Sequence, residues 1–169
     1  MATIAKLYSY EFSSVKTYLF ATLFIAGNII FPQLAHLIPL GGPTFLPIYF
    51  FTLIAAYKYG IKVGLLTALL SPLVNSLLFG MPALAALPII LIKSSLLATA
   101  AALVANYFSK VSLVAIFVAI LTYQVVGTGV EWILTRSFSL AFQDFSIGYP
   151  GMLIQLFGGF ALLKAIEKI

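Results

Sequence analysis

The stretch that decides the fold is Gly41–Ser95, which reads GGPTFLPIYFFTLIAAYKYGIKVGLLTALLSPLVNSLLFGMPALAALPIILIKSS. Two apolar runs, Phe45–Tyr57 and Val63–Phe79, flank a short basic turn at Lys58–Lys62, and a third apolar run opens after Pro82. With its flanks, each run is long enough to cross most of a bilayer, for which a helix needs about 20 residues. The prolines and glycines lie at one set of ends and the lysines mostly at the other, so the stretch also indicates an orientation.

The whole chain has the composition of a membrane protein. Its 169 residues are 63% hydrophobic and only 8% charged, whereas a soluble domain carries roughly 25% charged residues. We therefore predict one integral membrane domain over residues 1–169, with residues 1–16 as an N-terminal tail. Cysteine is absent, which excludes disulfides and thiolate metal sites, and no cofactor is expected. The nine basic residues are scattered singly, so a nucleic-acid partner is not expected.

The apolar pattern predicts an all-α bundle of six transmembrane helices, over about residues 17–37, 45–57, 61–79, 88–108, 111–133 and 150–166. A longer polar connection, Leu134–Tyr149, separates the last two. The tail has two open interpretations, a frayed end or a short interfacial helix with Tyr8, Phe12 and Val15 on one face.

Basic residues predict which side each loop faces. In the six-span arrangement seven lysines fall on the same side as both termini: Lys6, Lys16, Lys58, Lys62, Lys110, Lys164 and Lys168. Only Arg136 falls in a loop on the other side, and Lys93 lies inside a span. Because positively charged loops stay in the cytoplasm, we expect both termini to be cytoplasmic.

The prolines predict a broken outer half. Pro72 lies elsewhere, but the other seven fall in the outer half of the bundle: Pro32, Pro39, Pro43, Pro47, Pro82, Pro88 and Pro150. Irregular backbone at membrane depth is tolerated only where protein or a water-filled cavity surrounds it. We therefore expect the outer half to be concave.

Polar side chains inside the spans converge on that outer zone. The candidate substrate-binding residues are Asn28, His36, Asn75, Lys93, Gln124, Thr128, Glu131 and Gln155. Gln124, Thr128 and Glu131, at spacings of four and three, share one helix face. Each neutral polar residue could instead join helices, at about 0.6–2 kcal/mol. Glu131 could also lie at the interface.

Among these residues, Lys93 is the strongest indication of a cavity. A lysine at a helix centre costs about 2.5–3.5 kcal/mol on insertion scales, so it usually has a partner or a cavity. We expect its ammonium to face an outer cavity, near Asn75 and Gln124 and within reach of Glu131 or the substrate. Taken together, the charged and titratable residues favour a zwitterionic or anionic, partly aromatic solute: Lys93, Arg136 and His36 against Glu131 and Asp144.

Two sets of small residues allow close helix approach. Ala98, Ala101, Ala102 and Ala105 form one set, which we assign to packing within the chain. Thr17, Ala21, Thr22 and Ala26 form the other, which is open to a partner protein.

Enzymatic motifs are missing. The sequence has no Gly-rich phosphate loop with a lysine, no HExxH and no GxSxG element. We expect a protein that is not an enzyme and that cannot itself power transport with ATP. A membrane enzyme of unknown chemistry and a structural or assembly subunit remain as alternatives.

The segment GPTFLPIYFFTLIAAYKYGIKVGLLTALLSPLVNSLLFGMP resembles the substrate-binding S components of energy-coupling factor (ECF) vitamin transporters. It has a Gly-x-x-x-Leu-Pro lead into the second span, a glycine-centred inner turn and a Gly-Met-Pro outer turn. Size, six spans and inside termini extend the resemblance to nearly the whole chain.

This resemblance implies a high-affinity vitamin or micronutrient site in the outer half of a multi-pass protein of a prokaryotic cell membrane. It also implies a membrane coupling protein and two ATPase subunits as partners, with toppling of the S component to deliver its cargo. Family members often touch the coupling protein through Ala-x-x-x-Ala on the first helix. Here the matching residues are Thr22 and Ala26, with threonine in the first place.

Overall fold

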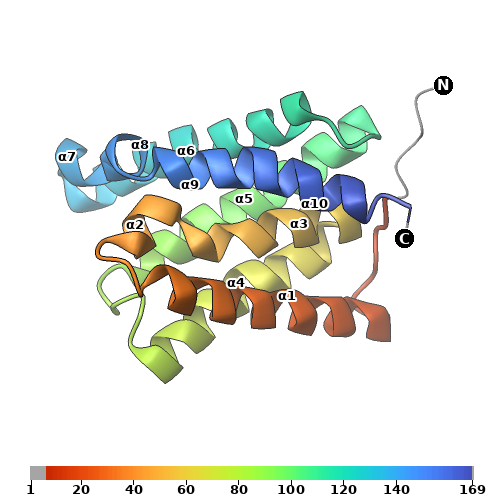
Figure 1. Ribbon diagram of the computed structural model, residues 1–169, viewed down its shortest axis with the longest axis horizontal. Coiled ribbons are helices and arrows are strands. Elements are labelled where there is room, and N and C mark those ends of the chain that lie inside the picture. The colour runs from red at the N-terminus through yellow and green to blue at the C-terminus, as the bar shows by residue number, and fades with distance from the viewer. Residues whose placement is uncertain (1–6, 169) are drawn as a thin grey trace.

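The computed structural model describes residues 7–168, and within that range every regular element is helical. Figure 1 shows an elongated bundle with the helices running roughly along its length. In chain order the elements are α1 (Val15–Ala35), α2 (Gly41–Phe45), η1 (Pro47–Tyr49), α3 (Phe50–Tyr59), α4 (Ile61–Phe79), α5 (Leu87–Phe108), α6 (Leu113–Thr135), α7 (Phe138–Ala141), α8 (Gln143–Ser146), α9 (Tyr149–Leu153), η2 (Ile154–Gly158) and α10 (Gly159–Ala165).

Four of the helices in residues 7–168, namely α1, α4, α5 and α6, are long and apolar enough to cross a membrane. Their mean hydropathies lie between 1.5 and 2.1. Large apolar side chains on their outer faces are exposed, among them Leu19, Leu23, Leu77, Leu103, Val114 and Val125. In water such a surface would aggregate, whereas in a bilayer it is solvated by lipid. The chain is therefore an all-α membrane protein.

The second and sixth predicted spans are built from shorter pieces. The second comprises α2, η1 and α3, and it is interrupted where Leu46 takes a left-handed conformation (φ 46°) directly before Pro47. The sixth runs without a gap through α9, the π-helical turn η2 and α10. The apolar pattern located both segments, but it contained no indication of the π turn.

One end of the bundle gathers the lysine-bearing turns. The Tyr8 amide donates to the Lys58 carbonyl (2.9 Å), and the Tyr57 hydroxyl donates to the Lys110 carbonyl (2.7 Å). The Lys58 ammonium donates to the Glu167 carbonyl (3.1 Å). These contacts bring the start of the described chain, the α3–α4 and α5–α6 turns and the C-terminal helix to the right-hand end in Figure 1. Lys6 lies outside the described residues.

Residues 7–14, the described part of the tail before α1, do not form an interfacial helix. Residues 7–10 form no regular element, and the segment lies against the end of α3. There the rings of Tyr8 and Tyr10 stack on each other (5.2 Å) and the ring of Tyr8 stacks on that of Tyr59 (5.8 Å). The frayed-tail interpretation also fails for these residues, because backbone hydrogen bonds and stacked rings hold them.

The alanine set on α5 packs inside the chain, as predicted. Ala98 and Ala101 are fully buried, and Ala102 and Ala105 nearly so, because α5 lies against α3, α4 and α6. The set on α1 divides between two faces. Thr17 and Ala21 are buried, whereas Thr22 and Ala26 are exposed.

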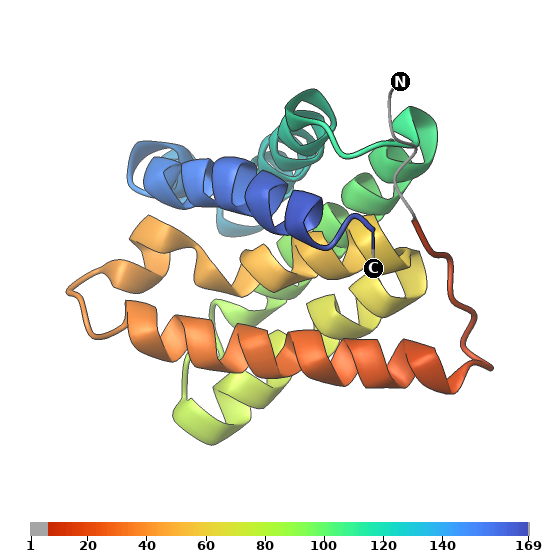
Figure 2. The ribbon, with the colours of Figure 1, turned by 45° about the vertical axis from the view of Figure 1, so that its right-hand side comes forward.

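The opposite end of the bundle is irregular. It holds α2, the turn that connects α4 to α5, and the segment that connects α6 to α9 (Figures 1 and 2). We expected residues 134–149 to be a plain connection, but the segment contains two short helices, α7 and α8. The side-chain oxygen of Ser137 accepts from the Leu140 amide and caps α7. This folded connection closes one wall of the site described below.

Candidate functional site

A cavity of about 570 Å³ opens at the irregular end of the bundle. Four prolines line it, as expected from their position in the sequence: Pro32, Pro43, Pro47 and Pro82. The rest of the wall is largely apolar and includes Leu46, Ile48, Tyr49, Ile89, Ile90 and Leu140. Six parts of the chain contribute: the end of α1, α2 with η1, the turn between α4 and α5, the start of α5, the end of α6, and α7–α8. The predicted concave half is therefore present.

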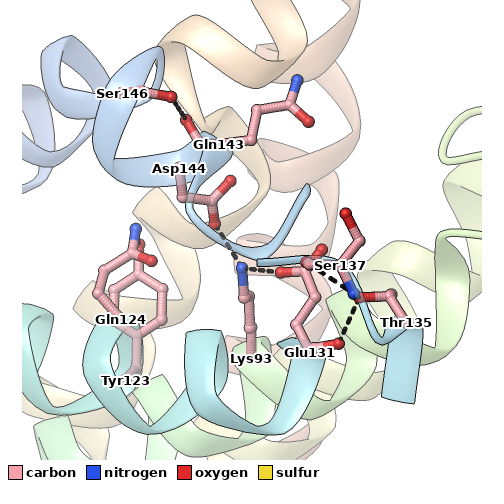
Figure 3. Close-up of polar contacts among 9 residues, drawn as sticks. All are labelled: Lys93, Tyr123, Gln124, Glu131, Thr135, Ser137, Gln143, Asp144 and Ser146. Atoms are coloured by element: carbon pink, nitrogen blue, oxygen red, sulfur yellow. Dashed lines mark hydrogen bonds and ion pairs between the residues drawn. The ribbon is translucent and has the colours of Figure 1, made fainter. Parts of the chain in front are cut away.

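Lys93 lies in this cavity between two carboxylates (Figure 3). Its ammonium is 2.5 Å from an oxygen of Glu131 and 2.8 Å from an oxygen of Asp144. Lys93 is within reach of Glu131, as predicted, and Asp144 is a second partner that the sequence analysis had not paired with Lys93. Two acids and one lysine give the group a formal charge of −1.

Helix geometry explains how the three side chains meet. Lys93 lies about two turns into α5, Glu131 lies in the last turns of α6, and Asp144 lies in the first turn of α8. At Gly127 of α6 a Cβ atom would come 2.7 Å from Cγ of Lys93. The glycine therefore leaves room for the lysine stem to pass along α6 toward the carboxylates.

The three charged groups differ in accessibility. The Lys93 side chain is 3% exposed, whereas those of Glu131 and Asp144 are each 17% exposed. Each carboxylate uses one oxygen for the lysine. A molecule entering the cavity would thus meet carboxylate before ammonium.

Of the eight predicted substrate-binding residues, His36, Lys93 and Glu131 line the cavity. His36 is exposed and lies at the rim beside Gly42, where a Cβ atom would come 2.7 Å from its Nε2. The remaining five are buried in two polar clusters between helices.

Asn28 and Asn75 belong to a cluster between α1, α3 and α4. The Asn28 amide donates to the hydroxyls of Thr52 (3.0 Å) and Ser71 (3.3 Å), and its oxygen accepts from the Phe51 amide (3.2 Å). Asn75 donates to the Asn28 carbonyl (2.8 Å). Both are fully buried, so this cluster joins helices.

Gln124, Thr128 and Gln155 lie between α6 and η2. The Tyr123 hydroxyl donates to Oε1 of Gln155 (3.0 Å) and accepts from Nε2 of Gln124 (3.0 Å). Within residues 7–168, Oε1 of Gln124, Oγ1 of Thr128 and Nε2 of Gln155 have no hydrogen-bond partner. None of the three residues lines the cavity. The Tyr123 ring lies 5.2 Å from that of Tyr49, which does.

The predicted substrate-binding residues did not include Asp144, Gln143 or Tyr49, although Asp144 was among the charges used to infer the solute. Asp144 and Gln143 lay in a stretch that we predicted to be a connection, and no polar spacing pointed to Tyr49. One indication existed. Asp144 is one of only four acidic residues, and it lies on the side of the bundle to which Lys93 and Glu131 were assigned.

The arrangement suits binding of a small molecule. Among the described residues, no group of three His, Cys, Asp or Glu side chains is placed to hold a metal ion. No family model matches this chain, and neither a curated protein nor a solved structure gives a match. An apolar cavity with a few convergent polar groups is the usual form of a ligand site.

Proposed function

We propose that this protein is the substrate-binding S component of an ECF-type importer. It holds a vitamin or related micronutrient in the cavity and depends on a membrane coupling protein and two ATPases to deliver it. The observation that carries the proposal is the cavity of about 570 Å³ with the Lys93, Glu131 and Asp144 side chains in its wall. Ligand sites for small molecules typically measure about 300–1,000 Å³.

Orientation supports an extracellular opening. The cavity lies at the end opposite the turns that carry Lys58, Lys62 and Lys110. Under the positive-inside rule those turns are cytoplasmic, and the cavity then opens outward. The proposal adds α2–α3 and α9–α10 to the four long helices as membrane-crossing segments, which gives six spans with both termini inside.

The exposed face of α1 supports a partner surface. Thr22 and Ala26 are both exposed, and their small side chains would let a helix of the coupling protein approach closely. A structural or assembly subunit would need no outer cavity, so the cavity favours transport over that alternative.

The test is whether the purified protein carries a small molecule. The protein is reconstituted in nanodiscs and then denatured, and the released compounds are identified by mass spectrometry. The cavity-filling variant Ile89→Trp should lose the compound, because Ile89 lines the cavity. The matched control Ile92→Trp changes an isoleucine of the same helix that does not line it and should retain the compound. Equal retention by both variants, or no compound in the wild type, would contradict the proposal.

Dependence on partners is tested separately. In proteoliposomes the chain alone should bind the released compound without accumulating it. Accumulation should require the coupling protein, both ATPases and ATP. Concentrative uptake by the chain alone would exclude an S component.

A further inference from the structure

We infer that the solute is an organic cation: a molecule with a protonated amine or quaternary ammonium attached to an apolar or aromatic body. This inference rests on the proposed function and specifies the class of substrate for the same cavity. It differs from the anionic or zwitterionic solute that the sequence alone favoured.

The first step is the charge of the wall. Lys93 contributes one positive charge, and Glu131 and Asp144 contribute two negative charges. Lys93 is the only lysine or arginine among the described residues that line the cavity, and His36 at the rim is formally neutral. A solute with one positive charge would therefore make the net charge of the occupied site zero, whereas a singly charged anion would make it −2.

The second step is which charge a solute reaches. The lysine is recessed, with 3% of its side chain exposed, and the two carboxylates keep 17% each. An anion would have to displace one carboxylate from Lys93 and would then lie beside the other. A cation can use carboxylate oxygens without breaking either ion pair, because each acid contacts Lys93 through a single oxygen.

The third step is the remainder of the wall. Tyr49 lines the same cavity as the charged group, and aromatic rings attract organic cations at centroid distances up to about 6 Å. Prolines and aliphatic side chains form most of the remaining surface. A bare metal ion would leave this apolar surface unused and would find no cluster of three suitable ligands among residues 7–168. The wall thus matches a cation that carries an apolar body.

The experiment compares three probes that differ in charge and share one ring: tryptamine (cation), tryptophol (neutral) and indole-3-acetate (anion). Their affinities for the protein in nanodiscs are measured by calorimetry and by thermal stabilisation. Tryptamine should bind at least about tenfold more tightly than either analogue. Glu131→Gln and Asp144→Asn should each reduce that preference. Glu11→Gln, which neutralises a carboxylate at the lysine-bearing end, should retain it.

Tighter binding of indole-3-acetate or tryptophol than of tryptamine would overturn the inference and leave the proposed function standing. If none of the probes binds, the compound released from the purified protein decides. A cationic compound supports the inference, and a neutral or anionic one overturns it. If no probe binds and no compound is released, the proposed function fails together with the inference.

Discussion

Removing the Lys93 ammonium should destabilise the protein through the two acids that it leaves behind. In Lys93→Met the apolar stem is kept, but Glu131 and Asp144 lose the cation that lies 2.5 Å and 2.8 Å from their oxygens. Breaking a buried ion pair from one side costs about 3–5 kcal/mol, because a charge is left uncompensated. Each acid keeps 17% exposure to the cavity, so we expect a loss near the lower end of that range.

A loss of about 3 kcal/mol corresponds to a fall in melting temperature of roughly 6–12 °C for a domain of this length. The assay is thermal unfolding in nanodiscs, followed by circular dichroism and by the fluorescence of Trp132, which is the only tryptophan and directly follows Glu131. Adding Glu131→Gln or Asp144→Asn to Lys93→Met should restore part of the loss, and adding both should restore most of it.

Two results would refute this reasoning. The first is a Lys93→Met variant as stable as the wild type, which would mean that the acids do not need the lysine. The second is a triple variant no more stable than Lys93→Met, which would attribute the loss to packing rather than charge.

Three further predictions concern orientation, partner contact and helix packing. This chain has no cysteine, so single cysteines can be introduced and labelled from either side of the membrane. Lys110→Cys should be labelled only from the cytoplasmic side and Arg136→Cys only from outside. Labelling of Lys110→Cys from outside would reject the six-span arrangement. Ala26→Trp should weaken co-purification with the coupling protein, because close contact between helices depends on small side chains. It should leave the affinity for the solute within about twofold. Unchanged co-purification would count against the exposed face of α1 as the contact surface. Gly64→Ala should lower stability by about 1–3 kcal/mol, because its Cβ would come 2.4 Å from a Cβ of α3. In the control Gly129→Ala the added atom has nothing within 4 Å, so this variant should not lose stability. Equal melting temperatures for Gly64→Ala and Gly129→Ala would refute the packing argument.

Much of the architecture could be predicted from the sequence, because a lipid environment strongly constrains where apolar, basic and helix-breaking residues can lie. Apolar runs, lysine positions and prolines predicted the helical segments, the lysine-bearing end and the concave end, and the structure has all three features. The breaks within the second segment were less visible. They depend on the left-handed backbone of Leu46 (φ 46°), a conformation that leucine rarely takes.

The residues of the site could be predicted from the sequence only in part. Spacing identifies which residues share a helix face, but it does not identify what that face meets. Asn28 and Gln124 were both assigned to the outer zone in the sequence analysis, yet neither lines the cavity. The Asn28 amide bonds to Thr52 of α3, and that of Gln124 bonds to the hydroxyl of Tyr123 on its own helix. Asp144 lies outside the long helices, where neither period nor depth gives information, and only the folding of α7 and α8 brings it to Lys93.

The second carboxylate is the feature that packing alone does not explain. One acid suffices to neutralise a buried lysine, and Glu131 on the neighbouring helix already does so at 2.5 Å. Asp144 adds a charge that must be desolvated, in a chain with only four acidic residues.

If Asp144 served only to hold α8 against α5, an uncharged hydrogen-bond acceptor would serve as well, and Asp144→Asn would leave cation affinity unchanged. If its charge acts on the solute, Asp144→Asn should keep the fold, since Lys93 retains Glu131, and should still lose affinity for a cation. The stability of Asp144→Asn and its affinity for a cation can therefore change independently. Measuring both in this variant distinguishes a structural ion pair from a binding site.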